Sequence, residues 1–384
     1  MTSPLRRRDL LILMLFAMTG WDRGGAGPST AVPTPVSAPR RRLRGADLSF
    51  TLELEAAGHT FTDAGRRDAL ERLLAARGAN VVRLRLWVDP EHGHGDLASA
   101  LALGRRAADT GCAILLDLHY SDTWADHSNQ HTPSAWRSAD LATLVDTVRS
   151  YTRAVVTAFV DQETPPAVVQ IGNEVTNGML WPSGQIVHSA GPAGWGDFGR
   201  LLRAGVAGVR DAAPASTETM IHIDRGGDNG GARYFYDNVV GSGVEFDLVG
   251  LSYYPFWHGS LETLSQNLRD LSRRYRKDVV VVETAYPWML PPAGDATRYF
   301  AVAPDQLPDG DRFPATPVGQ AAYFEALRAT IDAVPDHRGR GFLAWEPAWF
   351  PGVGWEYGDV NPYANLTMFT WDGDGLPSLA AFRA

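Results

Sequence analysis

The chain has 384 residues, of which 45% are hydrophobic and 21% are charged. This composition is typical of a globular protein with a large core, and it excludes disorder for the bulk of the chain. The single cysteine, Cys112, excludes an internal disulfide and a cysteine-rich zinc site. Residues 1–44 contain eight arginines and two aspartates and carry a charge of +6. Because the whole chain has a net charge of −9, residues 45–384 carry −15. Such an acidic body argues against a nucleic acid partner.

The first 23 residues have the features of an export signal. Three consecutive arginines precede an apolar run from Leu10 to Met18, about half the ~20 residues that a membrane-spanning helix needs. The Arg-Arg-Asp-Leu-Leu order from Arg7 to Leu11 resembles a twin-arginine signal. Residues 24–44 are rich in Pro, Gly, Ser and Arg, which predicts a linker. We therefore expect a secreted protein without stable membrane insertion, folded over residues 45–384; the alternative is a disordered tail on a cytosolic protein.

Short apolar runs alternate with amphipathic stretches through the rest of the chain. Buried parallel strands are expected at Ala46–Phe50, Val81–Trp87, Ala113–His119, Ala167–Gly172, Met220–Asp224, Phe246–Tyr253, Val279–Glu283 and Gly341–Glu346. Helices are expected at Arg66–Arg77, Leu97–Asp109, Leu141–Phe159, Phe198–Asp211, Leu261–Tyr275 and Gly319–Val334.

Eight strands that alternate with helices predict an α/β protein with a single (β/α)8 TIM barrel domain. A doubly wound open sheet is the alternative. The nucleotide-binding form of that sheet has no support, because no Gly-x-Gly-x-x-Gly motif follows the first expected strand.

Polar side chains follow the expected strands at their C-terminal ends, which in a barrel all face one mouth. Glu174 follows the fourth strand and Glu283 ends the seventh. Two carboxylates across one mouth are what a retaining glycosidase needs, provided that they lie about 5 to 5.5 Å apart. A larger separation would indicate inversion instead.

The chemistry assigns a different role to each carboxylate. Glu174 is the expected acid/base and must carry a proton at the working pH, whereas Glu283 is the expected nucleophile and must be ionised. Arg85 and Tyr254 are the donors expected to keep Glu283 ionised. Asn173, next to the acid, is suited to bind a sugar 2-hydroxyl.

Tryptophans are concentrated at or just beyond the expected strand ends, where a core would not need so many. Because aromatic faces stack on sugar rings, this distribution favours a carbohydrate cleft. The side chains expected to bind substrate are Arg85, Trp87, Asp117, His119, Trp124, Asn173, His222, Tyr254, Trp257, Trp288, Trp345 and Trp349. Part of the tryptophans can equally belong to the core, and the histidines lack the tight spacing of a catalytic zinc site.

Several sequence blocks together resemble glycoside hydrolase family 53, the arabinogalactan endo-β-1,4-galactanases. These blocks are Gly45–Ser49, Arg83–Pro90, Asp117–Asp126, Gln170–Glu174, Ser252–Trp257, Glu283–Pro287 and Trp345–Trp349. The most specific of them is Asp117–Asp126. The resemblance implies a (β/α)8 barrel, hydrolysis of β-1,4-linked galactan side chains of pectin with retention, Glu174 as acid/base and Glu283 as nucleophile.

The chain departs from the family pattern in several places, among them Phe50–Glu55 next to the first expected strand. Bacterial members often carry a calcium-binding Asp-Gly-Asp-Gly run after the nucleophile strand, but residues 289–300 retain only Asp295, so we expect no metal and no required cofactor. Residues 363–370 also differ from the usual family motif, which makes the polysaccharide less certain than the chemistry.

Three readings therefore stand at this point. The first is an endo-acting galactanase on galactan or arabinogalactan, working as a monomer. The second is another clan A β-glycanase that acts on mannan or xylan with the same pair of Glu. The third is a catalytically silent carbohydrate-binding barrel.

Overall fold

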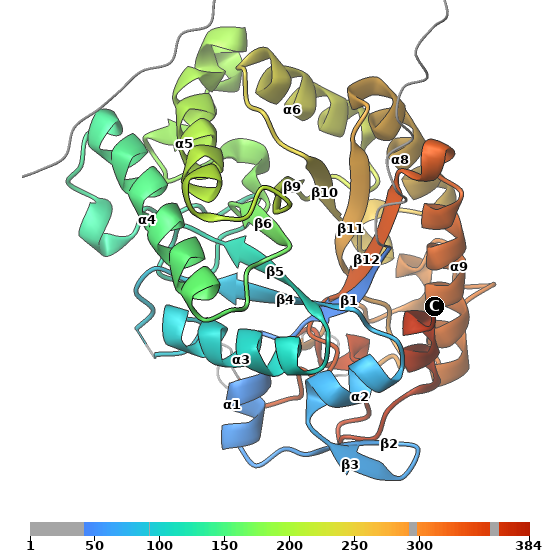
Figure 1. The fold of residues 1–384 in the computed structure, drawn as a ribbon. Coiled ribbons are helices and arrows are strands. Elements are labelled where there is room, and N and C mark those ends of the chain that lie inside the picture. Colours follow the sequence, from blue (N-terminus) through green and yellow to red (C-terminus); the bar gives the residue numbers. More distant parts are fainter. Residues whose placement is uncertain (1–41, 92, 292–297, 354–360) are drawn as a thin grey trace, which may run out of the picture. The chain divides into compact units, whose positions relative to one another are not determined.

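The computed structural model describes residues 42–91, 93–291, 298–353 and 361–384. The expected export signal, residues 24–41 of the expected linker and Asp295 lie outside the described residues. Eight parallel strands form a closed barrel in the order β1-β12-β11-β10-β9-β6-β5-β4 (Figure 1). They are β1 Leu43–Asp47, β4 Val81–Leu86, β5 Ala113–Leu118, β6 Val168–Ile171, β9 Glu218–Ile223, β10 Leu248–Ser252, β11 Asp278–Thr284 and β12 Gly339–Ala344. The predicted TIM barrel is confirmed.

Helices surround the barrel and connect consecutive strands (Figure 1). The longer ones are α2 Leu70–Ala76, α3 Leu97–Asp109, α4 Leu141–Asp161, α5 Gly196–Ala212, α6 Asn229–Gly241, α8 Leu261–Tyr275 and α9 Pro317–Asp332. Shorter ones are α1 Thr51–Ala56 and α7 Pro255–His258, and the 3₁₀ helix η8 Pro377–Phe382 follows β12. Several begin at a capping side chain; Asp140, for example, accepts a hydrogen bond from Thr143 N at the start of α4.

The structure corrects the sequence prediction at three points. The expected helix at Arg66–Arg77 is wrong in its first part, because Arg66–Asp68 forms strand β3 of a hairpin with β2, Phe61–Asp63. Helix α6 was not predicted. Strand β1 begins at Leu43, so it includes the last two residues assigned to the linker; Leu43 is buried and pairs with Gly341 of β12.

The apolar core has two parts, one on each face of the barrel sheet. The inner part fills the barrel and consists of Leu43, Val81, Leu115, Val168, Met220, Leu248, Val280, Val282 and Leu343. The outer part lies between the strands and the helices. Since successive side chains of a strand point to opposite faces, the strands are apolar on both sides at this level and become polar on the inner side further along.

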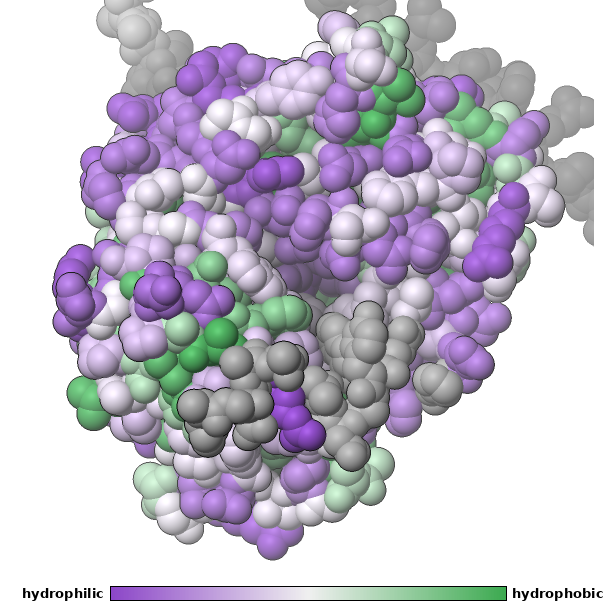
Figure 2. All heavy atoms as spheres, turned by 180° about the vertical axis from the view of Figure 1, so that it is seen from behind, coloured by the Kyte–Doolittle hydropathy of each residue, from purple (hydrophilic) through white to green (hydrophobic). Residues whose placement is uncertain are grey.

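No helix within the described residues is long and apolar enough to cross a membrane. The face of the molecule opposite to that of Figure 1 is hollowed near its centre, and mainly hydrophilic residues surround the hollow (Figure 2).

Candidate active site

A layer of buried polar side chains lies on the inner face of the strands, next to the inner apolar core. In three strands the polar residue comes two positions after a core residue and therefore points to the same side: Arg83 after Val81, Asp117 after Leu115, and His222 after Met220. Each of the three polar side chains is fully buried. The barrel geometry thus places charged groups next to one another where water is excluded.

Glu174 follows β6 in a tight turn. Gly172 has a φ of +78° and Glu174 a φ of +43°, a left-handed conformation that is uncommon for residues other than glycine. The neighbouring loop holds this turn in place, because Gln130 Nε2 donates to the carbonyl oxygen of Asn173 at 2.7 Å. The turn directs the Glu174 carboxylate toward β11.

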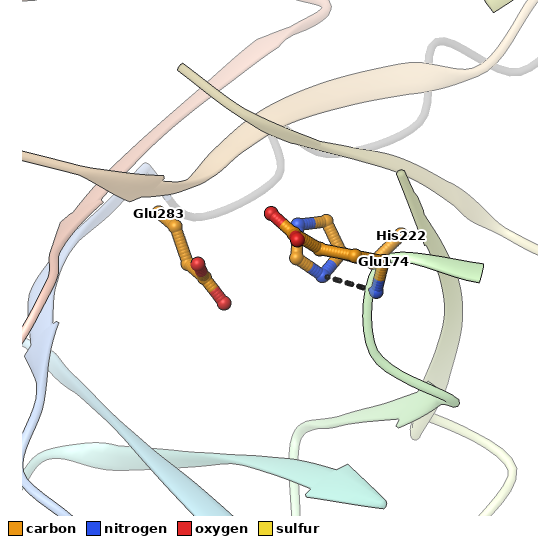
Figure 3. Close-up of side chains that lie close together, drawn as sticks. All are labelled: Glu174, His222 and Glu283. Atoms are coloured by element: carbon orange, nitrogen blue, oxygen red, sulfur yellow. Dashed lines mark hydrogen bonds between the residues drawn. The ribbon is translucent and has the colours of Figure 1, made fainter. Parts of the chain in front are cut away.

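Glu283 lies opposite Glu174 at the end of β11 (Figure 3). One carboxylate oxygen of each residue and one ring nitrogen of His222 all lie within 4.8 Å of one another. This separation agrees with the spacing of about 5 to 5.5 Å for retaining glycosidases and falls short of the ~6.5 to 9.5 Å of inverting ones.

Ser252, at the end of β10, connects the two carboxylates. Its hydroxyl donates to Glu174 Oε1 at 2.6 Å and lies within hydrogen-bond distance of Glu283 Oε2, at 3.3 Å. Behind it, His222 Nε2 lies 2.8 Å from the same hydroxyl. Burial lowers the pKa of His222 well below its usual value, so the ring is neutral. With Glu174 ionised, the tautomer that completes this chain donates from Nε2 to Ser252.

Arg83 is the cation at the centre of the site. Ion pairs of 3.0, 2.8 and 2.8 Å join its guanidinium to Asp47, Asp117 and Glu283. It also donates to Asn173 Oδ1 at 2.8 Å. Burial acts to lower the pKa of Arg83, but the three carboxylates outweigh burial and raise it above the usual value, so Arg83 stays charged.

The sequence analysis expected Arg85 to keep Glu283 ionised, and this assignment is wrong. Among the described residues, the arginine that forms an ion pair with Glu283 is Arg83. Arg85 instead lies among three aromatic rings, with its guanidinium carbon 4.6 Å from the centroid of Phe50 and 4.4 Å from those of Trp87 and Trp124. Its nearest carboxylate oxygen belongs to Glu346, at 3.9 Å.

Tyr254 donates to Glu283 Oε2 at 3.3 Å, as expected. Burial, followed by the nearby Glu283 carboxylate, raises the pKa of Tyr254 well above its usual value, so the phenol keeps its proton. Burial also raises the pKa of Glu283 to about 8; Arg83 opposes this shift and Glu174 adds to it. Because the two carboxylates lie this close, the proton affinity of Glu283 depends on the charge of Glu174. The 2.8 Å ion pair with Arg83 favours the negative charge on Glu283.

His119 connects the buried carboxylates to the aromatic residues of the mouth. Its Nδ1 accepts from Trp87 Nε1 at 3.3 Å and from Ala125 N at 3.2 Å. The proton of the neutral ring therefore lies on Nε2, which donates to Asp117 Oδ2 at 3.0 Å. Asn173 is also fixed by the protein, since its Nδ2 donates to Ala125 O at 2.8 Å.

Most of the predicted aromatic residues form a band around part of the mouth, here called the aromatic band. Ring centroids lie 5.2 Å apart for Trp87 and Trp124, 6.0 Å for Trp124 and Trp345, and 6.1 Å for Trp124 and Trp349. Tyr363, which the sequence analysis missed, extends the band from Trp345 and Trp349 to Tyr254 and Trp257.

Exposure separates the members of the aromatic band. Trp257 is 48% exposed and Trp349 is fully buried, stacked on Phe50 with 4.3 Å between the ring centroids. Trp288 lies outside the band, packed edge-on against Trp371. Arg85, Asp117, His119, His222 and Trp349 are almost wholly buried. The contacts that the structure shows for these five side chains are with other protein groups. Direct contact of the five with a sugar stays a prediction.

His127 and Asp224 were not predicted as one group. His127 Nδ1 lies 3.7 Å from Glu174 Oε2 and 3.3 Å from Asp224 Oδ2. The close contact with the Glu174 carboxylate, aided by the charge of Asp224, raises the pKa of His127 to about 9 despite partial burial. An imidazolium ion therefore stands beside the acid/base at neutral pH. No sequence pattern indicates this contact, because it joins residues of three separate loops.

Among the described residues, one group of three side chains has the spacing of metal ligands, and it consists of Glu174, His222 and Glu283. Both ring nitrogens of His222 already lie within hydrogen-bond distance of protein groups, with Ser252 at Nε2 and Asn173 at Nδ1. The short distances among these three residues therefore follow from the facing carboxylates and the hydrogen bonds of His222, and they do not require a metal ion. The expected lack of calcium in the loop after β11 stays a prediction.

A family model described as glycosyl hydrolase family 53 matches residues 43–382, which include the eight barrel strands and both carboxylates. The chain belongs to glycosyl hydrolase family 53. The family predicted from the sequence is thereby confirmed.

Several known proteins resemble this chain over most of its length. It is 41% identical over 347 residues to an uncharacterized protein of Niallia circulans, covering 89% of this chain and 93% of that protein. It is 38% identical over 314 residues to the arabinogalactan endo-beta-1,4-galactanase A of Aspergillus niger, covering 80% of this chain and 85% of that enzyme. The solved GH53 catalytic domain of Ignisphaera aggregans has a TM-score of 0.81 at 32% identity, over 91% of this chain and 97% of that one.

Proposed function

We propose that this family 53 enzyme is a retaining endo-β-1,4-galactanase that acts on galactan and arabinogalactan. The observation that carries the proposal is the placement of carboxylate oxygens of Glu174 and Glu283 within 4.8 Å of each other, around the hydroxyl of Ser252. A nucleophile and an acid at this distance reach the two ends of one glycosidic bond without a water molecule between them. The similarity to the Aspergillus niger galactanase supports the substrate.

In the first step, Glu283 attacks the anomeric carbon while Glu174 gives its proton to the departing glycosidic oxygen. Arg83 and Tyr254 hold the Glu283 carboxylate in the ionised form that the attack requires. A glycosyl ester with Glu283 results, and the shortened chain leaves. Ser252 can then donate to the newly ionised Glu174 and stabilise its charge.

In the second step, Glu174 removes a proton from a water molecule, and the resulting oxygen attacks the anomeric carbon of the ester. The bond to Glu283 breaks, and Glu283 becomes a carboxylate again beside Arg83. Two inversions at one carbon give net retention of the β configuration. The aromatic band offers apolar ring faces to sugars on either side of the cleaved bond, which suits cleavage within a chain.

A substrate panel tests this proposal against the two alternatives. Unbranched β-1,4-galactan, arabinogalactan, mannan and xylan are incubated with the enzyme and with Glu283→Gln as the inactive control. Release of galacto-oligosaccharides of mixed length by the native enzyme alone is the expected result. Preferred release from mannan or xylan would favour another β-glycanase, and the absence of hydrolysis would favour a silent binding barrel. Export of the chain and its monomeric state stay predictions.

A further inference from the structure

A second pocket lies outside the carboxylate site. It has a volume of about 450 Å³, within the ~300 to 1,000 Å³ of ligand-binding pockets. Its lining includes His131, Trp136, Arg137, Leu144, Trp181 and Ser183 and contains neither catalytic Glu nor any member of the aromatic band. We call it the side pocket.

Hydrogen bonds between two loops form the walls of the side pocket before any ligand binds. Trp181 N donates to Gln130 O at 2.8 Å, and Thr132 Oγ1 donates to Trp181 O at 2.8 Å. The loop after β5, which carries Trp136, is thereby fixed to the loop after β6, which carries Trp181. A preformed pocket costs less ordering entropy when a ligand enters it.

The lining combines apolar rings with free polar groups. Trp136 and Trp181 are partly exposed, and Leu144 supplies an aliphatic surface. Within the described residues, the Nη atoms of Arg137 and the imidazole of His131 have no hydrogen-bond partner. Indole rings beside unpaired donors suit a neutral sugar, which has apolar C–H faces and a rim of hydroxyl groups.

The side pocket is also coupled to the acid/base segment. Gln130 precedes His131 in the same loop, and its Nε2 donates to Asn173 O at 2.7 Å and to Asp126 O at 2.9 Å. One loop therefore supplies both a wall of the side pocket and a support of the turn that carries Glu174.

We propose that the side pocket binds one sugar residue of the polysaccharide, apart from the sugars on either side of the cleaved bond. This inference rests on the proposed function and adds a second contact for the same substrate. The sugar is a galactose unit of the chain or an arabinose unit of a branch, which share the chemistry that the lining recognises. Two contacts on one polymer increase its affinity, because binding of the second becomes intramolecular.

The test measures binding to the Glu283→Gln enzyme, which does not consume the ligand. Calorimetry with arabinogalactan, which carries both sugars, is expected to show a dissociation constant about tenfold higher after Trp136→Ala or Arg137→Ala, the factor that about 1.4 kcal/mol produces. Trp136→Phe keeps an aromatic face and is expected to recover part of the affinity. Arg153→Ala, an exposed arginine of α4, is the matched control and is expected to change nothing.

Crystal soaks of the same enzyme with galactotriose and with an arabino-oligosaccharide identify the sugar. Density for either one in the side pocket supports the proposal and names the unit. An empty side pocket in both soaks, or unchanged affinity in both alanine variants, overturns it. Because Arg137 is exposed, Arg137→Ala tests the proposal even if Trp136→Ala fails to fold. Normal hydrolysis of galactan alongside an empty pocket would leave the proposed function intact.

Discussion

Arg83 and Glu283 form a buried ion pair, with 2.8 Å between Nη1 and Oε1, although they lie on β4 and β11, which are not neighbours in the barrel. The pair crosses the barrel interior at the level of Asp47 and Asp117, which share the same guanidinium. A single cation thus fixes the nucleophile and compensates two further buried carboxylates.

Replacement of Arg83 by Met is expected to impair both activity and stability. Loss of a preorganised charge next to the nucleophile should lower kcat by about 10²- to 10³-fold or more. Three carboxylates would lose their partner, and breaking a buried ion pair typically costs ~3 to 5 kcal/mol in the free energy of unfolding. Steady-state kinetics and denaturant unfolding measure the two effects.

Arg340→Met is the matched control for Arg83→Met. Arg340 is also buried and forms ion pairs with Glu218 at 2.9 Å and Asp278 at 3.2 Å, at the starts of their strands and away from the carboxylate pair. We expect this variant to lose stability and to keep kcat while folded. A similar fall of kcat in both variants would show that Arg83 acts through stability alone.

Replacement of Ser252 by Ala is expected to lower kcat by about 10- to 100-fold, because hydrogen bonds to charged groups contribute ~1.5 to 3 kcal/mol. Stability should change little. Ser272→Ala is the control, since that hydroxyl is equally buried but donates to Arg269 O within α8. Equal kcat in both variants would refute a catalytic contribution of the Ser252 hydroxyl.

The strands were predictable because their residue pattern is dictated by burial on both sides. Runs such as Val279–Val282 are apolar at every position, as a strand between an inner core and a helix layer requires. The C-terminal ends of the expected strands indicated the mouth of the barrel, so Glu174 and Glu283 were expected to face each other there.

The hairpin β2–β3 was missed because its signals are local and conflicting. Leu70, Leu73 and Leu74 have helical spacing and belong to α2, and the charged residues before them extended the pattern backward. The turn itself needs left-handed φ values of +49° at Ala64 and +77° at Gly65, and only the glycine indicates this.

The partner of Glu283 was assigned to Arg85 rather than Arg83 for a geometric reason. Arg83 and Arg85 lie two positions apart on β4, so both side chains point into the barrel. Which of them meets β11 depends on the stagger of the strands around the closed barrel, and a sequence does not specify this stagger. For the same reason the contact of Ser252 with both carboxylates was not predicted.

The pKa of His127 can be measured directly. In an NMR titration of the imidazole, we expect a midpoint near 9 in the native enzyme, because the ion pairs with Glu174 and Asp224 stabilise the imidazolium ion. Glu174→Gln and Asp224→Asn should each move the midpoint down toward the ordinary value of ~6.5. A midpoint near 6.5 in the native enzyme would contradict the ion pairs.

The raised pKa of His127 also predicts how the free energy of unfolding depends on pH. Between pH 6.5 and about 9 the folded state binds more protons at this site than the unfolded state. Its stabilising contribution is therefore complete below pH 6.5 and disappears as the pH rises through about 9. The melting temperature of His127→Gln, compared with that of the native enzyme, should differ at pH 6 and converge at pH 10.

Two tryptophans of the aromatic band are expected to respond in opposite ways. Trp257→Ala removes a half-exposed ring and should raise KM for galactan several-fold with little change in stability. Trp349→Ala creates a cavity beside Phe50 and should cost ~3 to 5 kcal/mol in the free energy of unfolding. An unchanged KM for Trp257→Ala would remove that ring from the list of sugar contacts.

The stereochemistry of the first product tests the paired action of Glu174 and Glu283 most directly. Proton NMR spectra recorded during the first minutes of hydrolysis of unbranched β-1,4-galactan reveal the anomeric configuration before mutarotation. We predict that new reducing ends appear first as the β anomer, and that Glu283→Gln abolishes the signal. Initial appearance of the α anomer, or undiminished hydrolysis by Glu283→Gln, would contradict the mechanism.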